Sequence, residues 1–310
     1  SGSTPGARGA VGCGPRGAVV APGQSRGALP CCAHGAHGEP RGRRRPARRS
    51  VAVGRRPALP AEAGLVAHDL SRGNALVAAR WYGSDLVTLG VAAPLLGIAL
   101  LGAWGGSRRA VLVWMGMLAY SLHNAAFYLF GAAFNSLFLV YAALVALSGM
   151  ALVFGLLSID AKALHRQVQP GLPVRWIGGF LAGVAVTLGG LYGAFSLRHV
   201  ATGQGPALLD AMGPRAHLVA ALHLTMVVPV GLLAASWLWQ QPPWGYVWAT
   251  LWAVAGAACM LSLSAAPVAA VVVGPSTTWM PLLLWAPIGV GCVLVGGVLL
   301  RALRPDSRTR

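Results

Sequence analysis

One almost uninterrupted apolar stretch constrains the fold more than any other part of the chain: residues 110–157, AVLVWMGMLAYSLHNAAFYLFGAAFNSLFLVYAALVALSGMALVFGLL. A helix needs about 20 mainly apolar residues to cross a hydrocarbon core of about 30 Å. The stretch is therefore long enough for two membrane-spanning helices joined by a short turn. Backbone polar groups inside lipid must be satisfied within the segment itself, which favours helices.

Further apolar segments of similar length precede and follow this pair. Hydrophobic residues make up 56% of the chain and charged residues only 10%, too little charge to cover a soluble domain. The sequence predicts an all-α, polytopic transmembrane bundle of about seven helices over residues 81–303, followed by a basic tail at 304–310. We expect the helices near residues 84–104, 110–131, 135–158, 176–197, 217–239, 246–273 and 281–302.

Residues 1–80 differ sharply in composition from the rest of the chain. They are rich in Gly, Ala, Pro and Arg and hold 13 of the 24 Lys and Arg residues. Such a segment buries too little apolar surface to fold, so we expect a disordered basic tail. Because the chain begins with Ser and its first Met is Met115, one interpretation is upstream sequence translated from a misplaced start. A basic arm for anionic lipid and a targeting leader are the alternatives.

The distribution of positive charge predicts an orientation in the cell membrane. The C-terminus and the loops expected on its side carry nine Lys and Arg residues near the helices, and the other side carries four. The positive-inside rule then places the C-terminus in the cytoplasm and the N-terminus outside. The arginine run within residues 41–56 opposes this assignment, but it lies beyond the distance over which the rule counts strongly.

Several functional classes are disfavoured by what the chain lacks. No carboxylate is expected at mid-membrane, and no hydrolase, nucleotide-binding or metalloprotease motif stands in a credible context. The basic residues do not form a folded, interleaved surface, so we predict no nucleic-acid partner. The cysteines lack zinc-site or disulfide spacing, and Cys259 and Cys292 are interpreted as small packing residues. We predict a protein without enzymatic activity, resident metal or cofactor.

The few polar residues of the helices predict a common pocket. Tyr120, Asn124 and Tyr128 recur every four residues and share one helix face, which His123 borders. At 1.5 Å per residue, His123 and His223 lie at similar depth, about 12 Å and 9 Å below the outer surface. Pro229 is expected to kink the helix below His223. The predicted outward-facing polar pocket comprises Tyr120, His123, Asn124, Tyr128, Asn135, His223 and Thr225.

Two other interpretations of these polar residues stay open. In the first, the polar side chains only join neighbouring helices, through hydrogen bonds that contribute roughly 0.6–2 kcal/mol each in membranes. Alternatively, His123 and His223 can hold a metal or a haem.

Glycines at four-residue spacing indicate close helix contacts. Gly179 and Gly183, then Gly189 and Gly193, lie in the fourth apolar segment, and the seventh holds another group: Gly289, Gly291, Gly296 and Gly297. Packing within the bundle is one interpretation, and a homo-oligomer formed through these helices is the other.

Two stretches, AFYLFGAAFNSLFLVYAALVALS at 126–148 and VVPVGLLAASWLWQQPPWGYVWA at 227–249, resemble a group of bacterial multi-pass proteins with no assigned activity. The similarity covers roughly residues 81–275 and implies seven helices. Members of that group often carry an acidic residue at the position of His223 and a Lys at that of Ala255. The resemblance therefore implies that this chain has lost a charged pair.

Three functional classes follow. The first is a non-enzymatic membrane protein for sensing, assembly or partner binding, with the lipid bilayer as its surroundings. The second is a small-solute transporter or permeability factor. The third is a membrane redox or metal-binding protein that uses His123 and His223.

Overall fold

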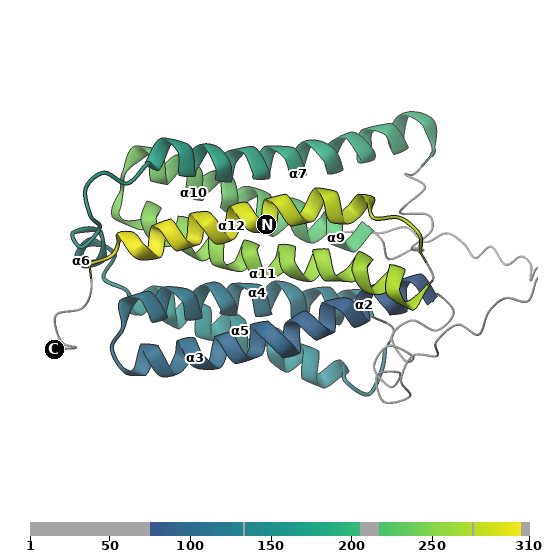
Figure 1. Cartoon of the computed structure of the whole chain (residues 1–310), viewed down its shortest axis with the longest axis horizontal. Coiled ribbons are helices and arrows are strands. Elements are labelled where there is room, and N and C mark those ends of the chain that lie inside the picture. Colours follow the sequence, from purple (N-terminus) through teal and green to yellow (C-terminus); the bar gives the residue numbers. More distant parts are fainter. Residues whose placement is uncertain (1–74, 133, 205–216, 275, 305–310) are drawn as a thin grey trace, which may run out of the picture. The chain divides into compact units, whose positions relative to one another are not determined.

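The computed structural model describes residues 75–132, 134–204, 217–274 and 276–304, all within one compact unit, Val53–Arg310. Apart from an isolated bridge between Val168 and Leu303, the regular elements of these residues are helical (Figure 1). In chain order they are α2 (Ala75–Val87), η1 (Thr88–Ala92), α3 (Ala93–Trp104), α4 (Arg108–Gly131), α5 (Phe138–Ser158), α6 (Ala161–His165), α7 (Val174–Thr202), α9 (His217–Leu222), η2 (His223–Val227), α10 (Val228–Gln240), α11 (Pro243–Val273) and α12 (Met280–Ala302). The elements η1 and η2 are π-helical turns that continue their neighbours.

Over the described residues, seven helical stretches are long and apolar enough to cross a membrane: Ala75–Trp104, Arg108–Gly131, Phe138–Ser158, Val174–Thr202, His217–Gln240, Pro243–Val273 and Met280–Ala302. This confirms the predicted all-α bundle of seven transmembrane helices. The chain is a multi-pass integral membrane protein.

The first helix begins earlier than the sequence predicted. It starts at Ala75, whereas residues up to 80 were expected to belong to the tail. The reason is Trp81, whose buried ring packs edge-on against Phe127 and Tyr128 of α4 and so holds this end of the helix to the bundle. The remainder of the predicted tail, and residues 305–310 at the other terminus, lie outside the described residues.

Helix α11 lies in the middle of the bundle and contacts α2, α4, α10 and α12 (Figure 1). It buries more residues than any other described helix, many of them small, such as Ala249 and Ala253. Small side chains let neighbouring backbones approach closely. At Gly245 an added Cβ would lie 2.5 Å from the carbonyl oxygen of Trp237, so only glycine permits the turn from α10 into α11.

Positive side chains gather where α4 and α7 begin and α12 ends. We call this the basic end: Arg108, Arg109, Lys162, Arg166, Arg175, Arg301 and Arg304. Backbone pairing of Gln169 with Ala302, and a hydrogen bond from Arg109 to the Leu303 carbonyl, join these segments. The opposite end holds the turn between α4 and α5 and the start of α12.

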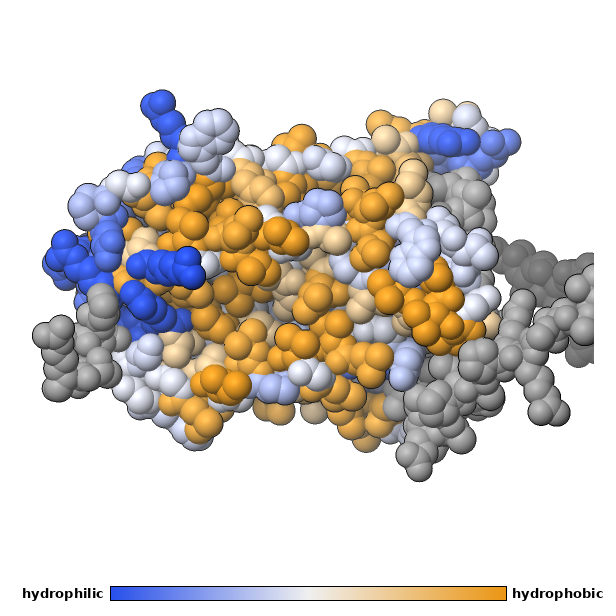
Figure 2. All heavy atoms as spheres, in the orientation of Figure 1, coloured by the Kyte–Doolittle hydropathy of each residue, from blue (hydrophilic) through white to orange (hydrophobic). Residues whose placement is uncertain are grey.

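Large apolar side chains cover the sides of the helices. Leu89, Leu139 and Phe154 are more than half exposed, as are many others. Figure 2 shows a mainly hydrophobic middle on one face, with hydrophilic residues toward its two ends. A water-soluble protein rarely exposes so much contiguous apolar surface, so lipid is the surrounding that this exterior fits.

Candidate functional site

Two π-helical turns lie close to the predicted site residues, each shortly before a proline: η2 contains His223 and Thr225, and Thr88 of η1 contacts Tyr120. The Ala93 amide donates to the Thr88 carbonyl, and the Val228 amide donates to that of His223, five residues back in both cases. Proline cannot donate to the helix ladder, and its ring clashes with the carbonyl four residues earlier. Pro94 and Pro229 thus account for the wider turns, which occur frequently at functional sites.

Thr88, the first residue of η1, is the centre of a small polar network. Its hydroxyl lies 2.8 Å from the Tyr120 hydroxyl and 3.3 Å from the donating amide nitrogen of Asn124. It also donates to the carbonyl of Ser84, whose own hydroxyl bonds that of Ser262 on α11. The shared face of Tyr120 and Asn124 is therefore directed at the first transmembrane helix.

Asp85 and Tyr128 form a second polar contact, one turn further toward the end opposite the basic end. The Tyr128 hydroxyl donates to the carboxylate of Asp85 at 2.5 Å. The ring of Tyr128 stacks on Tyr141 of α5, with 5.3 Å between centroids. This contact connects the first three transmembrane helices.

His123 of α4 and His223 of η2 face each other. Their rings lie nearly parallel, with 5.5 Å between centroids and 7° between planes. His223 is fully buried, and its Nδ1 lies 2.9 Å from the hydroxyl of Tyr192 on α7, where either atom donates according to the tautomer. The Nδ1 of His123 is shielded from solvent and has no hydrogen-bond partner among the described residues.

The histidine pair lies between two cavities. The larger one, about 250 Å³, has mainly apolar walls from six of the seven transmembrane helices, all except the first, and its lining includes Leu188, Trp252 and Ile288. The smaller one, about 60 Å³, is lined by the polar network around Tyr120 and Asn124. Both cavities are lined by His123, His223 and Cys259.

Two of the sequence-predicted pocket residues lie apart from this group. Asn135 stands in the turn before α5, where its side-chain oxygen accepts the Leu137 amide at 2.8 Å. Thr225 is exposed on η2, and its hydroxyl donates to the carbonyl of Ala221 at 2.7 Å. The structure brings together Tyr120, His123, Asn124 and His223, with Tyr128 one turn away.

Sequence reasoning missed Ser84, Thr88, Tyr192 and Ser262. A signal existed for the first two, because hydroxyl residues four apart in an apolar helix share one face. No comparable signal pointed to Tyr192, since a lone tyrosine gives no indication of the helix that it will meet. Ala255, singled out by the resemblance, lines the larger cavity together with His223.

Within the described ranges, no three His, Cys, Asp or Glu side chains come close enough together to hold a metal ion. Cys259 and Cys292 both line the larger cavity as free thiols.

Comparison with protein-family models, with curated proteins and with solved structures finds no match to this chain. The resemblance to bacterial multi-pass proteins stays a prediction.

Proposed function

We propose that this protein binds a small, mainly apolar molecule inside the membrane, beside His123 and His223, and acts without catalysing a reaction. The observation that carries the proposal is the Nδ1 of His123, which is buried at a cavity wall and has no hydrogen-bond partner in the part of the chain that the structure describes. A buried polar group left unsatisfied is costly, and a ligand that bonds to it removes that cost.

The cavity walls indicate the chemistry of the ligand. Most of the lining side chains are aliphatic or aromatic, and the imidazoles supply the main polar contacts. A volume of about 250 Å³ is smaller than typical drug-sized sites of about 300–1,000 Å³. It exceeds the roughly 150 Å³ of an apolar cavity that can accept benzene. A small aromatic or aliphatic compound with one carbonyl or hydroxyl group fits both properties.

We further assign the basic end to the cytoplasm, which places the smaller, polar cavity on the outer side of the histidine pair. Asn124 and Phe127, which line that cavity, lie further along α4 from the basic end than His123 does. A ligand from the outer leaflet or the external medium would then meet hydroxyl and amide groups before the imidazoles. This arrangement suits a sensing role, since a ligand bound there contacts several helices at once.

The experiment measures ligand-induced thermal stabilisation of the purified protein in detergent, with benzaldehyde, benzyl alcohol and toluene as probes. A ligand that binds only the folded state raises the melting temperature with its concentration. We expect benzaldehyde and benzyl alcohol to stabilise the wild type more than toluene does, and His123→Phe to abolish that difference. The matched control is His199→Phe, at an exposed position near the end of α7.

A variant that fills the larger cavity provides a second, independent test. Ala255→Phe places a ring in the larger cavity, and Ala143→Phe adds the same ring to an exposed position on α5. We expect the first change to remove stabilisation by all three probes and the second to leave it intact. If none of the probes stabilises the wild type while both variants fold normally, the proposed ligand class is wrong.

Small-solute transport is a second candidate, favoured by the two π turns. Each turn interrupts a helix beside the polar network or the cavity, and interrupted helices are typical of transporter binding sites. Cys259 lines both cavities, so its labelling reports access. In a variant with Cys259 as the sole cysteine, transport predicts reaction with a membrane-impermeant thiol reagent from both sides. Reaction from one side only supports ligand binding instead.

The glycine-rich face of α7 supports a homo-oligomer as part of this proposal. A Cβ added at Gly179, Gly183 or Gly190 would meet nothing within 4 Å, so this face is open to lipid or to another helix. Gly289 and Gly291 of α12 instead pack against Met260 and Phe180 within the bundle. We expect Gly183→Leu to shift cross-linked dimers to monomers, whereas Gly97→Leu, at an equally open position on α3, leaves dimers unchanged.

A further inference from the structure

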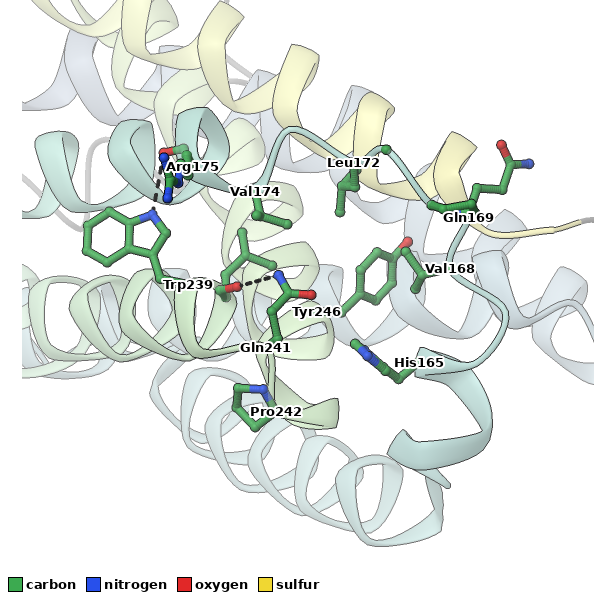
Figure 3. A pocket seen from close by; sticks show the side chains of 13 residues that line it. His165, Val168, Gln169, Leu172, Val174, Arg175, Trp239, Gln241, Pro242 and Tyr246 are labelled. Atoms are coloured by element: carbon green, nitrogen blue, oxygen red, sulfur yellow. Dashed lines mark hydrogen bonds between the residues drawn. The ribbon is translucent and has the colours of Figure 1, made fainter.

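A separate and larger cavity, of about 750 Å³, lies at the basic end (Figure 3). It is formed where the segment between α6 and α7 passes the end of α10 and the first turn of α11. We call it the basic-end pocket and define it by its polar and aromatic lining: His165, Gln169, Arg175, Trp239, Gln241 and Tyr246. None of these residues belongs to the histidine site described above.

The lining of the basic-end pocket favours an anion. It contains Arg175 and two side-chain amides, but no Asp or Glu. Among the described residues, no carboxylate pairs with the Arg175 guanidinium, and the buried Nδ1 of His165 has no hydrogen-bond partner. Arg175 also stands in the first turn of the 29-residue helix α7, whose N-cap Pro173 provides no side-chain cap. The positive end of that helix adds to the attraction for negative charge.

The pocket walls are held in place by specific contacts. The indole of Trp239 donates to the Arg175 carbonyl at 3.4 Å (Figure 3) and lies against Gly178, where an added Cβ would be 2.3 Å from the indole nitrogen. Gln241 adopts a left-handed backbone with φ of 62°, and its side chain donates to the Leu238 carbonyl at 2.9 Å. These contacts fix the α7 and α10 sides of the pocket before any ligand arrives.

The position of the pocket along the bundle matches the depth of lipid headgroups. Trp176, next to Arg175, is 84% exposed, and Trp239 at the pocket wall is about half exposed. Tryptophan is enriched at the boundary between hydrocarbon and water. Apolar residues, among them Leu172 and Leu238, line the same pocket, so an anion held there has room for an attached hydrocarbon part.

We propose that the basic-end pocket binds a phosphate-bearing anion, with Arg175 as its main electrostatic contact and the amide of Gln241 as a hydrogen-bond donor. The phosphate group can come from the headgroup of an anionic phospholipid or from free phosphate. Basic pockets between transmembrane helices are typical sites for anionic headgroups. The apolar part of the lining favours the lipid.

The experiment compares lipid retention by the full chain and by single variants. Protein purified in detergent is titrated with phosphatidylglycerol or phosphatidylcholine, and bound lipid is counted by native mass spectrometry. We expect the wild type to bind phosphatidylglycerol more tightly than phosphatidylcholine. Loss of one charge-assisted contact predicts about tenfold weaker phosphatidylglycerol binding by Arg175→Gln. Arg175→Lys, which keeps the charge, should recover part of that loss.

The matched control is Arg301→Gln, which removes the same charge from the same end outside the pocket lining. Equal loss in Arg175→Gln and Arg301→Gln, or no preference for phosphatidylglycerol in the wild type, would overturn the proposal. A competition experiment with inorganic phosphate distinguishes a lipid headgroup from free phosphate as the occupant. Phosphate that displaces the lipid at similar concentration identifies a free anion as the occupant, and failure to displace it identifies the lipid. An equal melting temperature of all variants without added lipid shows that folding is unaffected.

Discussion

The imidazole rings of His123 and His223 lie face to face across the bundle, with their centroids 5.5 Å apart. They come from helices separated by a hundred residues of chain. Among the described residues, His223 has a partner that fixes its ring, the hydroxyl of Tyr192, whereas the Nδ1 of His123 has none. One ring of the pair is thus anchored, and the other depends on its packing. This asymmetry makes His123 the member with hydrogen-bonding capacity to offer a ligand.

The bond between Tyr192 and His223 should be measurable as stability. Replacing Tyr192 with Phe leaves the buried Nδ1 of His223 without its partner, which should lower the free energy of unfolding in bilayers by about 1–2 kcal/mol. Unfolding by steric trapping would measure this. Tyr82→Phe, at a half-buried tyrosine for which no hydrogen bond appears among the described contacts, should change the value by less. Equal effects would mean that the bond adds nothing to stability.

The close approach of α2 and α11 at Gly83 should tolerate no larger side chain. A Cβ there would lie 2.5 Å from the carbonyl oxygen of Ala265. Gly83→Leu therefore forces the two helices apart and breaks the hydroxyl contact between Ser84 and Ser262, costing about 1–3 kcal/mol or more. Thermal unfolding in detergent checks this against Gly97→Leu, where the added side chain meets open space. A Gly83→Leu protein as stable as Gly97→Leu would contradict the predicted contact.

A double-mutant cycle should show that Asp85 and Tyr128 are coupled. Their 2.5 Å hydrogen bond joins a phenol to a carboxyl group in a partly buried position. Bonds to charged groups contribute about 1.5–3 kcal/mol, so Tyr128→Phe should destabilise the wild type by about that amount. The same change made in an Asp85→Asn background should cost less. Additive effects of the two substitutions would show that the contact contributes no coupling energy.

The orientation proposed from the charges can be tested with engineered cysteines. The test starts from a variant in which the native cysteines are replaced. Ser136 lies in the turn between α4 and α5, and Arg301 lies at the basic end. We expect a membrane-impermeant thiol reagent to label Ser136→Cys in intact cells, and Arg301→Cys only after the cells are permeabilised. The reverse pattern would place the basic end outside and invert the proposed direction of ligand access.

The transmembrane helices could be predicted from the sequence because each apolar segment is by itself long enough to cross a membrane. Six of the seven spans begin and end close to the predicted positions, and the first begins early because Trp81 packs on α4. The partners of polar groups could not be predicted in the same way. Nothing in the local pattern shows that Thr88 meets Tyr120 or that Tyr192 meets His223, since those pairs depend on how the helices rotate and pack. At Pro229 the sequence predicted only a kink. The structure instead has a π-helical turn over His223–Val227, because the proline widens the turn that precedes it.

The central position of α11 has a consequence for how the protein is made. Three of the four helices that it mainly contacts, α2, α4 and α10, leave the ribosome before it does, and 178 residues separate Ser84 from its partner Ser262. Until then, the hydroxyl of Ser84 lacks the partner that it has in the folded bundle. We therefore expect the bundle to assemble fully only after the sixth span has inserted among the first, second and fifth.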